Sequence, residues 1–539
     1  MIRKSVLICL ACIISVILCG QNSLAVHSNK PFYSSGEQIG IVVSNMSHEG
    51  DEIVYIELLT KDGKIIDIQS VRSESNICTT VFTVPADVKS DWYVIRAYTI
   101  WNPSLQIKDV GYRTLALYNE FESFDPTPSV ILPKTGSTPE DGISIVTNRD
   151  RYKKGEVVEV TATFLSPDPQ RSTDVIITSV VHSPTYQLMK SYEQLVPQIP
   201  DVKFRSPPVD NQKINKLLFV GRVNEDIGNI LGAVYVVEAR ALSWVPITEN
   251  QTFGIDLEDF EGQRHVQYIG MKPLGDIKYF GVDMMTFSSI IKWPEFKWAP
   301  LPYPSGILKY LESARKRKII DDIFNLPGKI DIVEDQIESS FIKADRSYTP
   351  DNFIRFKDTR DFISEVIPFF IIKKDGEELT YRLRLEKNIL SLSEPLLFLN
   401  GHMVTKISDL LDIDLDDLER IDLFRKEKSL DEQFGILGKN GAVVFYTKDH
   451  SIRSLSSSEF ILNGFEPLMN TIDPVILPEH PHFAPLLYWN ATARDSDSVG
   501  FSFDVSHDKG EYIIVVERHS NSGNQKTTKS ILLGGKSKG

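Results

Sequence analysis

The chain has 539 residues, of which 24% are charged and 42% are hydrophobic, and its formal net charge is −14 at pH 7. Such an acidic surface argues against nucleic acid as a partner, because it repels a phosphate backbone. At about 100–200 residues per domain, a chain of this length is expected to form roughly three to five domains.

The N-terminus has the layout of a cleavable export signal. Two basic residues precede an apolar run over residues 6–18, and a small-x-small site follows at residues 23–25. The run is shorter than the about 20 residues that span a bilayer, and no later apolar stretch reaches that length either. We expect cleavage after Ala25, with lipidation of Cys19 or Cys12 as the alternative. The mature chain would then be soluble or peripherally bound.

Three of the four cysteines fall in or beside this N-terminal segment, which leaves Cys78 alone in the mature chain. A single cysteine gives neither a disulfide framework nor a thiolate metal site. Residues 76–82 around it have a strand-like pattern, where a small buried hydrophobic residue is the usual role of cysteine.

One motif occurs twice in the N-terminal half. Residues 29–41 and 148–160 both fit Asn-x3-Tyr-x2-Gly-Glu-x-[Ile/Val]-x-[Ile/Val]. The glycine permits a tight turn, and the alternating apolar residues after it line one face of a strand. Because the two occurrences lie more than a hundred residues apart, they predict duplicated domains and not a solenoid of short repeats.

The rest of the N-terminal half reads as short antiparallel strands. Residues 53–60 alternate in polarity, residues 61–64 form an Asp-Gly turn and residues 92–98 form a further strand, which is the pattern of a β-sandwich. A proline-rich linker at 125–139 leads to the second copy of the motif. Strand patterns then resume at 217–237 and predict a third small β domain that ends near residue 290.

The middle of the chain is a connector rich in proline and aromatic residues. Its large rings are Trp293, Phe296, Trp298 and Tyr303. We expect these rings to pack within the connector, with a ligand surface as the second interpretation. Ser305 can cap a helix that runs to Ile323, and Thr359 can cap another.

Residues 365–450 alternate between strand and helix patterns. Residues 395–399 and 442–446 are short and rich in apolar residues, which predicts two strands, and we expect them to be neighbours in one sheet of this segment. Residues 409–423 have apolar residues at helical spacing, which predicts an amphipathic helix over this sheet. Leu418 would then be buried and the acidic residues of the helix would face water.

Several segments resemble known families. Residues 33–37, with 61–64 and 91–99, resemble the macroglobulin-type β-sandwich domains of alpha-2-macroglobulin-like proteins, and residues 152–160 resemble them in the second copy. Residues 217–260 are similar to the carboxypeptidase regulatory-type β domain. The only Gly-Glu-Gln sequence follows a serine and not a cysteine, so the thioester of active macroglobulins is not expected.

Three later blocks, at 395–404, 416–422 and 435–448, resemble in this order the plug domain of TonB-dependent outer-membrane transporters. Asn400 stands where that family usually has Asp, so no role of that carboxylate is carried over. The residues after 450 are too few for a transporter barrel, and we expect no transport by this chain itself. The whole order of domains resembles a group of exported proteins of Bacteroidetes envelopes.

The predicted fold is mainly β, with several antiparallel β-sandwich domains in tandem and one small α/β plug-like domain. The expected domains are a signal peptide at 1–25, a macroglobulin-type sandwich at 26–120, a second one at 140–207, a carboxypeptidase-regulatory-like β domain at 208–290, a helical connector at 291–364, the plug-like domain at 365–450 and a C-terminal β domain at 451–535.

No set of residues predicts catalysis, cofactor binding or metal binding. His480 and His482 have no third ligand nearby, so exposed loop histidines are expected. Residues 412–417 carry four aspartates but lack the glycine of a calcium loop, which favours a solvated acidic helix face. The basic run at 315–318 is expected to lie on the solvent-exposed face of its helix, or else to contact an acidic partner or lipid head groups.

These patterns predict a protein that is not an enzyme and needs no cofactor. We expect an interaction or scaffold protein of the periplasm or outer membrane that binds other envelope proteins, with a TonB-dependent transporter as one candidate partner and with peripheral membrane association open. One alternative is an accessory of TonB-dependent nutrient uptake that binds a glycan or peptide. The other is a hydrolase whose residues are scattered along the chain, because a fold does not determine a function.

Overall fold

The computed structural model describes most of the chain. The described residues are 24–44, 52–74, 76–101, 106–122, 142–165, 174–199, 216–225, 231–248, 250–255, 257–271, 277–285, 291, 293, 296–323, 341, 343–353, 356–375, 378–449, 459–466, 484–493, 496–505, 509–520 and 523–534.

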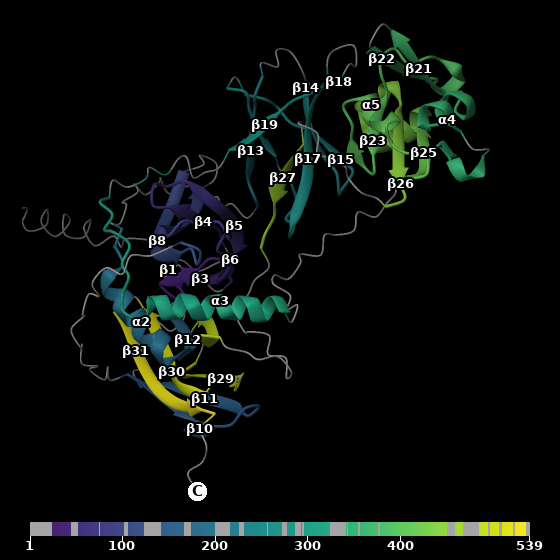
Figure 1. The fold of residues 1–539 in the computed structure, drawn as a ribbon. Helices are drawn as coiled ribbons and strands as arrows, with labels where there is room; N and C mark the ends of the chain where they lie inside the picture. The colour runs from purple at the N-terminus through teal and green to yellow at the C-terminus, as the bar shows by residue number, and fades with distance from the viewer. Residues whose placement is uncertain are drawn as a thin grey trace, which may run out of the picture. The chain divides into compact units, whose positions relative to one another are not determined.

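The chain forms two compact units (Figure 1). Unit 1 contains residues 1–215, 290–328 and 465–539, and unit 2 contains residues 216–289 and 329–464. Both units are rich in antiparallel strands, so the predicted mainly β fold with tandem sandwiches is confirmed. Among the described residues, none of the helices is both long and apolar enough to cross a bilayer.

The first β-sandwich of unit 1 contains eight strands. They are β1 (Ala25–Ser28), β2 (Phe32–Ser34), β3 (Gln38–Ser44), β4 (Ile53–Thr60), β5 (Ile65–Arg72), β6 (Ile77–Thr83), β7 (Asp91–Trp101) and β8 (Gln106–Tyr118). One sheet has the order β2-β8-β7-β4-β5 and the other has the order β1-β3-β6. Alternate apolar residues of both sheets, such as Ile41, Ile56 and Ile95, form the core between them, because successive side chains of a strand point to opposite faces.

The second β-sandwich repeats this topology strand for strand. Its strands are β9 (Ile143–Thr147), β10 (Arg151–Tyr152), β11 (Val157–Phe164), β12 (Val175–His182), β28 (Leu486–Ala493), β29 (Ser498–Asp504), β30 (Gly510–Ser520) and β31 (Gly523–Leu533). The sheets have the orders β10-β31-β30-β12-β28 and β9-β11-β29, which match those of the first sandwich. In Figure 1 the yellow C-terminal strands accordingly lie beside the blue strands of the second copy.

The prediction of a separate C-terminal β domain at 451–535 is therefore wrong, as is the end of the second sandwich at 207. In the first sandwich a tight turn at 61–64 joins β4 to β5, whereas residues 183–485 separate the equivalent strands β12 and β28. A sequence pattern shows which face of a strand is buried but not which strand pairs with it. The insertion thus hid the second half of this sandwich.

The N-terminal boundary also differs from the prediction. Leu24 is only 4% exposed and belongs to the core of the first sandwich, and Ala25 pairs with Ser44. Gly111 lies so close to this strand that a Cβ on it would come within 2.2 Å of the Leu24 carbonyl oxygen. A signal that ended after Ala25 would remove both residues from the sandwich, so this boundary does not fit the fold. Residues 1–23 lie outside the described residues.

Helices α2 (Ser183–Leu195) and α3 (Ile307–Ile323) pack against the outer face of the first five-stranded sheet. The shared cluster contains Phe32, Trp92 and Tyr118 of the sheet, Leu188 and Tyr192 of α2, and Ile307, Tyr310 and Leu311 of α3. The helix predicted from Ser305 to Ile323 is confirmed. Trp298 and Tyr303 of the connector pack against the same cluster, and the Trp293 indole N–H donates to the Lys61 carbonyl, as expected for a packed connector.

Unit 2 contains the predicted third β domain. Its strands are β13 (Phe219–Val223), β14 (Leu231–Val236), β15 (Ala241–Trp244), β16 (Thr252–Ile255), β17 (Gln263–Met271), β18 (Ile277–Tyr279), β19 (Val282–Met285) and β27 (Glu459–Asn463). One sheet has the order β16-β13-β19, and the other has the order β15-β14-β17-β18 with β27 paired to β17. Strand β27 comes from the segment that was assigned to the C-terminal domain, because it returns across the unit to pair with β17.

The α/β domain of unit 2 begins before residue 365. Its elements are β20 (Arg346–Tyr348), η3 (Pro350–Asn352), α4 (Thr359–Val366), β21 (Phe370–Asp375), β22 (Glu378–Leu383), η4 (Glu386–Asn388), β23 (Leu396–Leu399), β24 (His402–Met403), α5 (Ile407–Leu411), β25 (Leu418–Phe424), α6 (Glu427–Phe434), η5 (Gly435–Asn440) and β26 (Ala442–Thr447). The main sheet has the order β20-β25-β26-β23-β24. Because β20 and α4 belong to this domain, the predicted connector at 291–364 extends too far.

Two predictions for this domain have opposite outcomes. Residues 395–399 and 442–446 are neighbours as predicted, since β23 and β26 pair in parallel with Leu397 opposite Val443. The prediction of a helix at 409–423 is wrong, because α5 ends at Leu411 and the chain re-enters the sheet as β25. The apolar positions fit both periods, and pairing with β20 and β26 decided the outcome. Leu418 is nevertheless fully buried, as expected.

Candidate functional site

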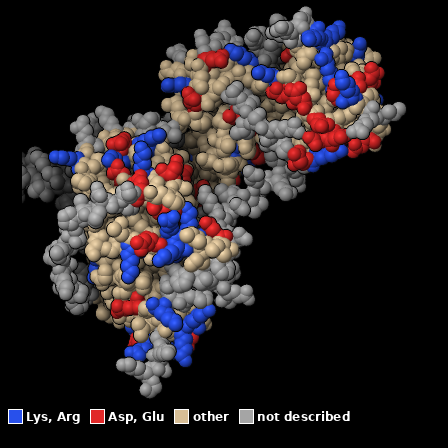
Figure 2. Space-filling view, viewed as in Figure 1, with Lys and Arg blue, Asp and Glu red and all other residues tan. Residues whose placement is uncertain are grey.

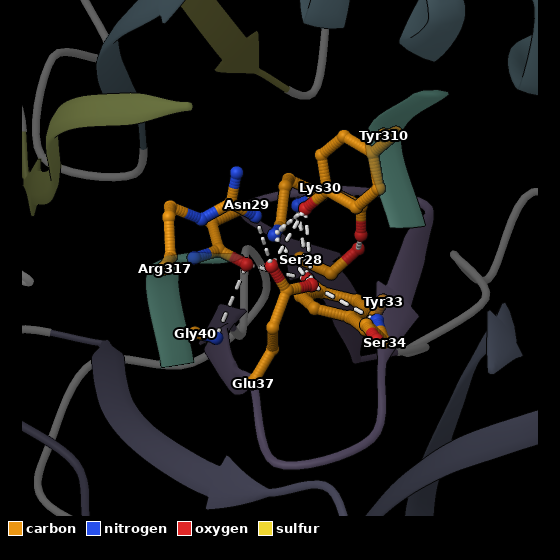
Figure 3. A network of polar contacts seen from close by, with 9 residues as sticks. All are labelled: Ser28, Asn29, Lys30, Tyr33, Ser34, Glu37, Gly40, Tyr310 and Arg317. Carbon is orange, nitrogen blue, oxygen red and sulfur yellow. Dashed lines mark hydrogen bonds and ion pairs between the residues drawn. The ribbon is translucent and has the colours of Figure 1, made fainter. Parts of the chain in front are cut away.

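The repeated motif builds a closed turn at the start of each sandwich, and Figure 3 shows the turn of the first copy. In the first copy the Asn29 side-chain oxygen accepts hydrogen bonds from the Tyr33 hydroxyl and from the Gly40 N–H, the latter at 3.2 Å. The Tyr33 hydroxyl in turn accepts from the Lys30 N–H at 2.9 Å. Gly36 adopts a φ of +79°, which a side chain would strain, so the motif requires glycine there.

This turn places Glu37 where donors from two elements converge. The Ser34 N–H donates to the Glu37 carboxylate at 2.9 Å, and the Lys30 ammonium lies 3.2 Å from the same oxygen. From helix α3, the Tyr310 hydroxyl donates at 2.9 Å and the Arg317 guanidinium donates at 2.9 Å. The Lys30 ammonium also donates to the Tyr310 hydroxyl at 2.6 Å, which closes the network.

The electrostatics of this network keep Glu37 charged. Burial alone would raise the pKa of Glu37, but the Lys30 and Arg317 charges and the Ser34 N–H outweigh it and lower that pKa to about 2. Burial lowers the pKa of Lys30, and the Glu37 charge partly opposes this. Burial and the Glu37 charge raise the pKa of Tyr310 well above its ordinary value. With its charge matched by two cations, the carboxylate serves to anchor α3 and is poorly suited to proton transfer.

The second copy of the motif has the same turn, and none of the described helices covers its carboxylate. The Arg149 N–H donates to the Tyr152 hydroxyl at 2.8 Å, and the Lys153 N–H donates to the Glu156 carboxylate at 2.8 Å. Arg149 pairs with Glu156 at 3.1 Å, as Lys30 pairs with Glu37, but these side chains are 64% and 36% exposed. The motif is therefore first a structural turn, and only its first copy contributes to a buried site.

The outer-face residues beside the two turns explain this difference. Phe32 and Trp92 pair with the same residue of β8, and both are buried under the helices. At the equivalent positions Arg151 and Glu511 pair with the same residue of β31, and both are exposed. Aromatic residues stabilise a helix that covers them, whereas charged residues favour contact with water.

A second buried ion pair lies on the outer face of β4 and β7. The Arg96 guanidinium donates to the Glu57 carboxylate at 2.8 Å, and the Tyr98 hydroxyl donates to it at 3.0 Å. The Glu57 and Arg96 side chains are 0% and 2% exposed, although the alternating pattern of residues 53–60 suggested a wet face for Glu57. The Trp293 ring lies 5.9 Å from the Arg96 guanidinium carbon, so the connector covers this face.

The basic run at 315–318 divides between two environments. Arg317 points into the network, and the Lys318 ammonium lies 3.4 Å from the Glu120 carboxylate. Arg315 and Lys316 are exposed, and Figure 2 shows Lys and Arg side chains over α3. The expectation of a solvent-exposed face holds for Arg315 and Lys316 but not for Arg317 and Lys318, because helical spacing directs neighbouring residues to different sides.

The other residues singled out in the sequence form no reactive site. Cys78 is buried in β6, and burial raises the pKa of its thiol to about 12, so it serves as a small core residue, as expected. Asp414 accepts from the Asp416 N–H at 3.0 Å in an exposed turn. No group of three or more potential metal ligands occurs within the described residues. His480 and His482 lie outside those residues.

Sequence reasoning missed the network itself. Glu37 is part of the repeated motif, and a basic residue follows the asparagine in both copies, so the Lys30–Glu37 pair could have been found from the repeat. The contribution of Tyr310 and Arg317 had no such signal, because Arg317 lies 280 residues from Glu37 along the chain.

Unit 2 has a different polar cluster, at the contact between its β domain and its α/β domain. The His265 ring pairs with Glu238 at 2.7 Å and the His402 ring pairs with Glu459 at 2.8 Å, and the two rings lie 5.5 Å apart. The Gln267 side chain binds the backbone of β24. Its amide nitrogen donates to the Met403 carbonyl at 2.8 Å, and its amide oxygen accepts from the Met403 N–H at 2.9 Å. A histidine oriented by a carboxylate is one part of a hydrolytic triad.

Comparisons with known proteins give weak similarities only. No protein-family model and no curated protein matches this sequence. The solved structures that resemble the chain include alpha-2-macroglobulin from Escherichia coli activated by trypsin, at 7% identity and a TM-score of 0.23, covering 96% of this chain and 42% of that chain. A Salmonella alpha-2-macroglobulin reacted with methylamine has 7% identity and a TM-score of 0.16, covering 96% of this chain and 23% of that one.

A third similar structure contains the fibronectin(III)-like modules of Clostridium thermocellum CbhA, at 9% identity and a TM-score of 0.12, covering 48% of this chain and 92% of that chain. Scores this low carry no argument about function. The chain also spans less than half of the Escherichia coli alpha-2-macroglobulin, so the activity of that protein is not transferred to it.

Proposed function

We propose that this protein is a non-catalytic interaction or scaffold protein of the cell envelope. The observation that carries the proposal is the network around Glu37, in which buried charges join a helix to a sandwich. Its carboxylate and cations are matched to one another, so the chain uses this buried polar site for internal docking. Such a site suits a protein that holds domains in place.

The architecture gives the proposal a second support. A β domain and an α/β domain follow β12 and precede β28, so the chain enters and leaves this insertion through adjacent strands of one sheet. This arrangement suits the presentation of binding surfaces to partners.

The cellular setting rests on sequence resemblance. The export-signal pattern at the N-terminus, the macroglobulin-type motifs and the three blocks that resemble a TonB-dependent plug domain favour an exported Bacteroidetes-type protein of the periplasm or outer membrane. Outer-membrane proteins are accordingly the first candidate partners, and a TonB-dependent transporter is the most specific of them.

Fractionation and co-purification of the full chain test this proposal. The tagged chain should be exported, and mild detergent extracts should yield it together with other envelope proteins. Native size exclusion should then show a complex larger than the 61.0 kDa chain. Recovery from the cytoplasm, or recovery only as a free monomer from the envelope, would contradict the proposal.

A hydrolase is the second candidate, favoured by the two Glu–His pairs of unit 2. His402 is buried, and its Nε2 atom has no hydrogen-bond partner among the described residues, so it could accept a proton from a nucleophile. A screen with ester, peptide and glycoside substrates tests this candidate, with His402→Ala as the control. Turnover that is lost in His402→Ala would support it, and the absence of turnover in the unaltered chain would leave the scaffold proposal favoured.

A further inference from the structure

Three aliphatic side chains project from one short segment of the α/β domain in unit 2. Ile389 is 62% exposed, Leu390 is 47% exposed and Leu392 is 81% exposed, which makes Leu392 the most exposed large hydrophobic residue among those described. Ser391 between them is buried. We call residues 384–393 the aliphatic tip. Three neighbouring aliphatic residues in water are unfavourable unless they meet a partner.

The tip is a hydrogen-bonded hairpin and not a frayed loop. The Leu385 N–H donates to the Ile389 carbonyl at 2.7 Å, and the Ile389 N–H donates to the Glu386 carbonyl at 3.4 Å. Lys387 and Asn388 between them have φ values of +59° and +61°, which is the geometry of a type I′ turn. The backbone therefore holds the aliphatic side chains in a defined position.

Neighbouring elements fix the base of the tip. The Arg425 guanidinium donates to the carbonyls of Arg384 at 2.9 Å and Leu385 at 2.8 Å. The Ser391 hydroxyl accepts from the Leu383 N–H at 3.2 Å and donates to the Ser393 carbonyl at 2.7 Å. Because Ser391 is tied inward in this way, the residues on either side of it are directed outward.

A second exposed segment adjoins the tip. The Ser393 N–H donates to the Asn440 side-chain oxygen at 3.0 Å, which ties the tip to η5. On η5, Ile436 is 54% exposed and Lys439 is exposed. The tip and η5 together thus present four exposed aliphatic side chains.

The charges around these side chains are mixed, with an excess of basic ones. Arg384 and Lys387 of the tip and Lys439 of η5 are exposed, whereas the acidic residues of this region are Glu386 and Glu394. Glu394 is hydrogen-bonded to Tyr381. On a chain whose net charge is −14, an excess of one basic residue beside these aliphatic side chains is a local exception.

This composition fits a lipid surface better than a protein surface. Protein interfaces rely on Trp, Tyr and Arg anchors, and leucine is under-represented among them. Segments that bind membrane surfaces combine aliphatic side chains that enter the acyl boundary with Lys and Arg that meet anionic head groups. The tip has the second combination and no aromatic residue.

We propose that the aliphatic tip binds the surface of an anionic bilayer. Ile389, Leu390 and Leu392 enter the acyl boundary, and Arg384 and Lys387 meet the phosphate groups. This inference gives the proposed envelope protein its membrane contact, and it rests on the proposed function only for the identity of the membrane. A single small tip supplies weak, reversible binding that falls with ionic strength.

Vesicle flotation of the purified full chain tests the proposal. The chain should float with vesicles of phosphatidylethanolamine and phosphatidylglycerol, and less with phosphatidylcholine alone or at high salt. The double substitution Ile389→Ser and Leu392→Ser should weaken binding by about tenfold or more, because it removes most of the inserted apolar surface. Lys387→Glu should weaken binding to the anionic vesicles only.

The matched control is Leu308→Ser, since Leu308 is an exposed leucine (44%) on α3 in unit 1. This variant should float like the unaltered chain, and all variants should keep its melting temperature because they change exposed side chains. The proposal is overturned if the unaltered chain does not float, if the double variant floats equally well, or if Leu308→Ser loses binding to the same extent.

Two further outcomes separate this proposal from the proposed function. A chain that co-purifies with envelope proteins but binds no vesicles overturns the lipid contact and leaves the scaffold function standing. A double variant that loses a co-purified protein in that situation identifies the tip as a protein-docking site instead. A chain that floats but fractionates with the cytoplasm supports the lipid contact and contradicts the envelope function.

Discussion

Replacing Glu37 with Gln tests whether the buried network holds α3 on the first sandwich. The substitution keeps the shape of the side chain but removes the negative charge that pairs with both Lys30 and Arg317. These two side chains are 5% and 16% exposed, so both cations would stay largely buried after losing the counter-charge that they share. We expect α3 to separate from the sandwich more readily.

Two arguments give the size of this effect. Removing one partner of a buried ion pair costs about 3–5 kcal/mol, and the partial exposure of Glu37 favours the lower end of this range. Independently, the pKa of Glu37 falls from an ordinary 4.5 to about 2, which corresponds to about 3 kcal/mol of linked stability. At about 1.4 kcal/mol per power of ten, the protection of the α3 amides against hydrogen exchange should fall by about a hundredfold.

The pH dependence follows from the direction of the pKa shift. Because the pKa of Glu37 is lower in the folded protein than its ordinary value, its contribution is complete above pH 4.5 and is lost as the pH falls towards 2. The difference in α3 protection between the unaltered chain and Glu37→Gln should therefore shrink over this range. At neutral pH the difference should be at its full size.

The second sandwich provides the matched control. Glu156→Gln changes the equivalent residue of the same motif, but Glu156 is partly exposed and no helix among the described residues covers it. We expect this variant to leave the α3 amides and the overall stability nearly unchanged. Equal effects of the two substitutions, or unchanged α3 protection in Glu37→Gln, would refute the anchoring role of the network.

Three other predictions concern packing and processing. Trp92→Ala should lower the free energy of unfolding by about 3–5 kcal/mol, because Trp92 is 1% exposed beneath the helices. Chemical unfolding of unit 1 measures this loss, and an unchanged stability would show that the helices do not depend on this ring. Leu418→Asp should place a charge in the core of the α/β domain, so limited proteolysis should degrade that domain but spare unit 1; a resistant α/β fragment would contradict this. Mass spectrometry should find a mature N-terminus before Leu24, and a terminus at Val26 would show that the sandwich tolerates the loss of Leu24 and Ala25.

Much of the local structure could be predicted because it depends on near neighbours. The two copies of the motif form the same turn, since its asparagine, tyrosine and glycine act within a few residues of one another. Helix α3 lies where the cap and the apolar spacing placed it. Residues 395–399 and 442–446 also form strands as predicted, because both are short apolar segments of the kind that a sheet buries on both faces.

The failures share one physical cause. Residues 418–424 could form a helix or a strand, and hydrogen bonds to β20 and β26, supplied by distant parts of the chain, selected the strand. The second sandwich was divided in error because its halves are separated by residues 183–485. In both cases the partner of a strand is a property of the fold, and a local pattern does not contain it.

The candidate site shows the same division. The sequence by itself determined the turn around Glu37 and Glu156, because backbone N–H groups and a neighbouring basic residue bind the carboxylate in both copies. Only the tertiary structure decided that Glu37 is buried, because the helices that cover it pack on Phe32 and Trp92 of the adjacent face. At the equivalent positions Arg151 and Glu511 stay in water, so burial and the fate of each carboxylate depend on the apolar surface around it.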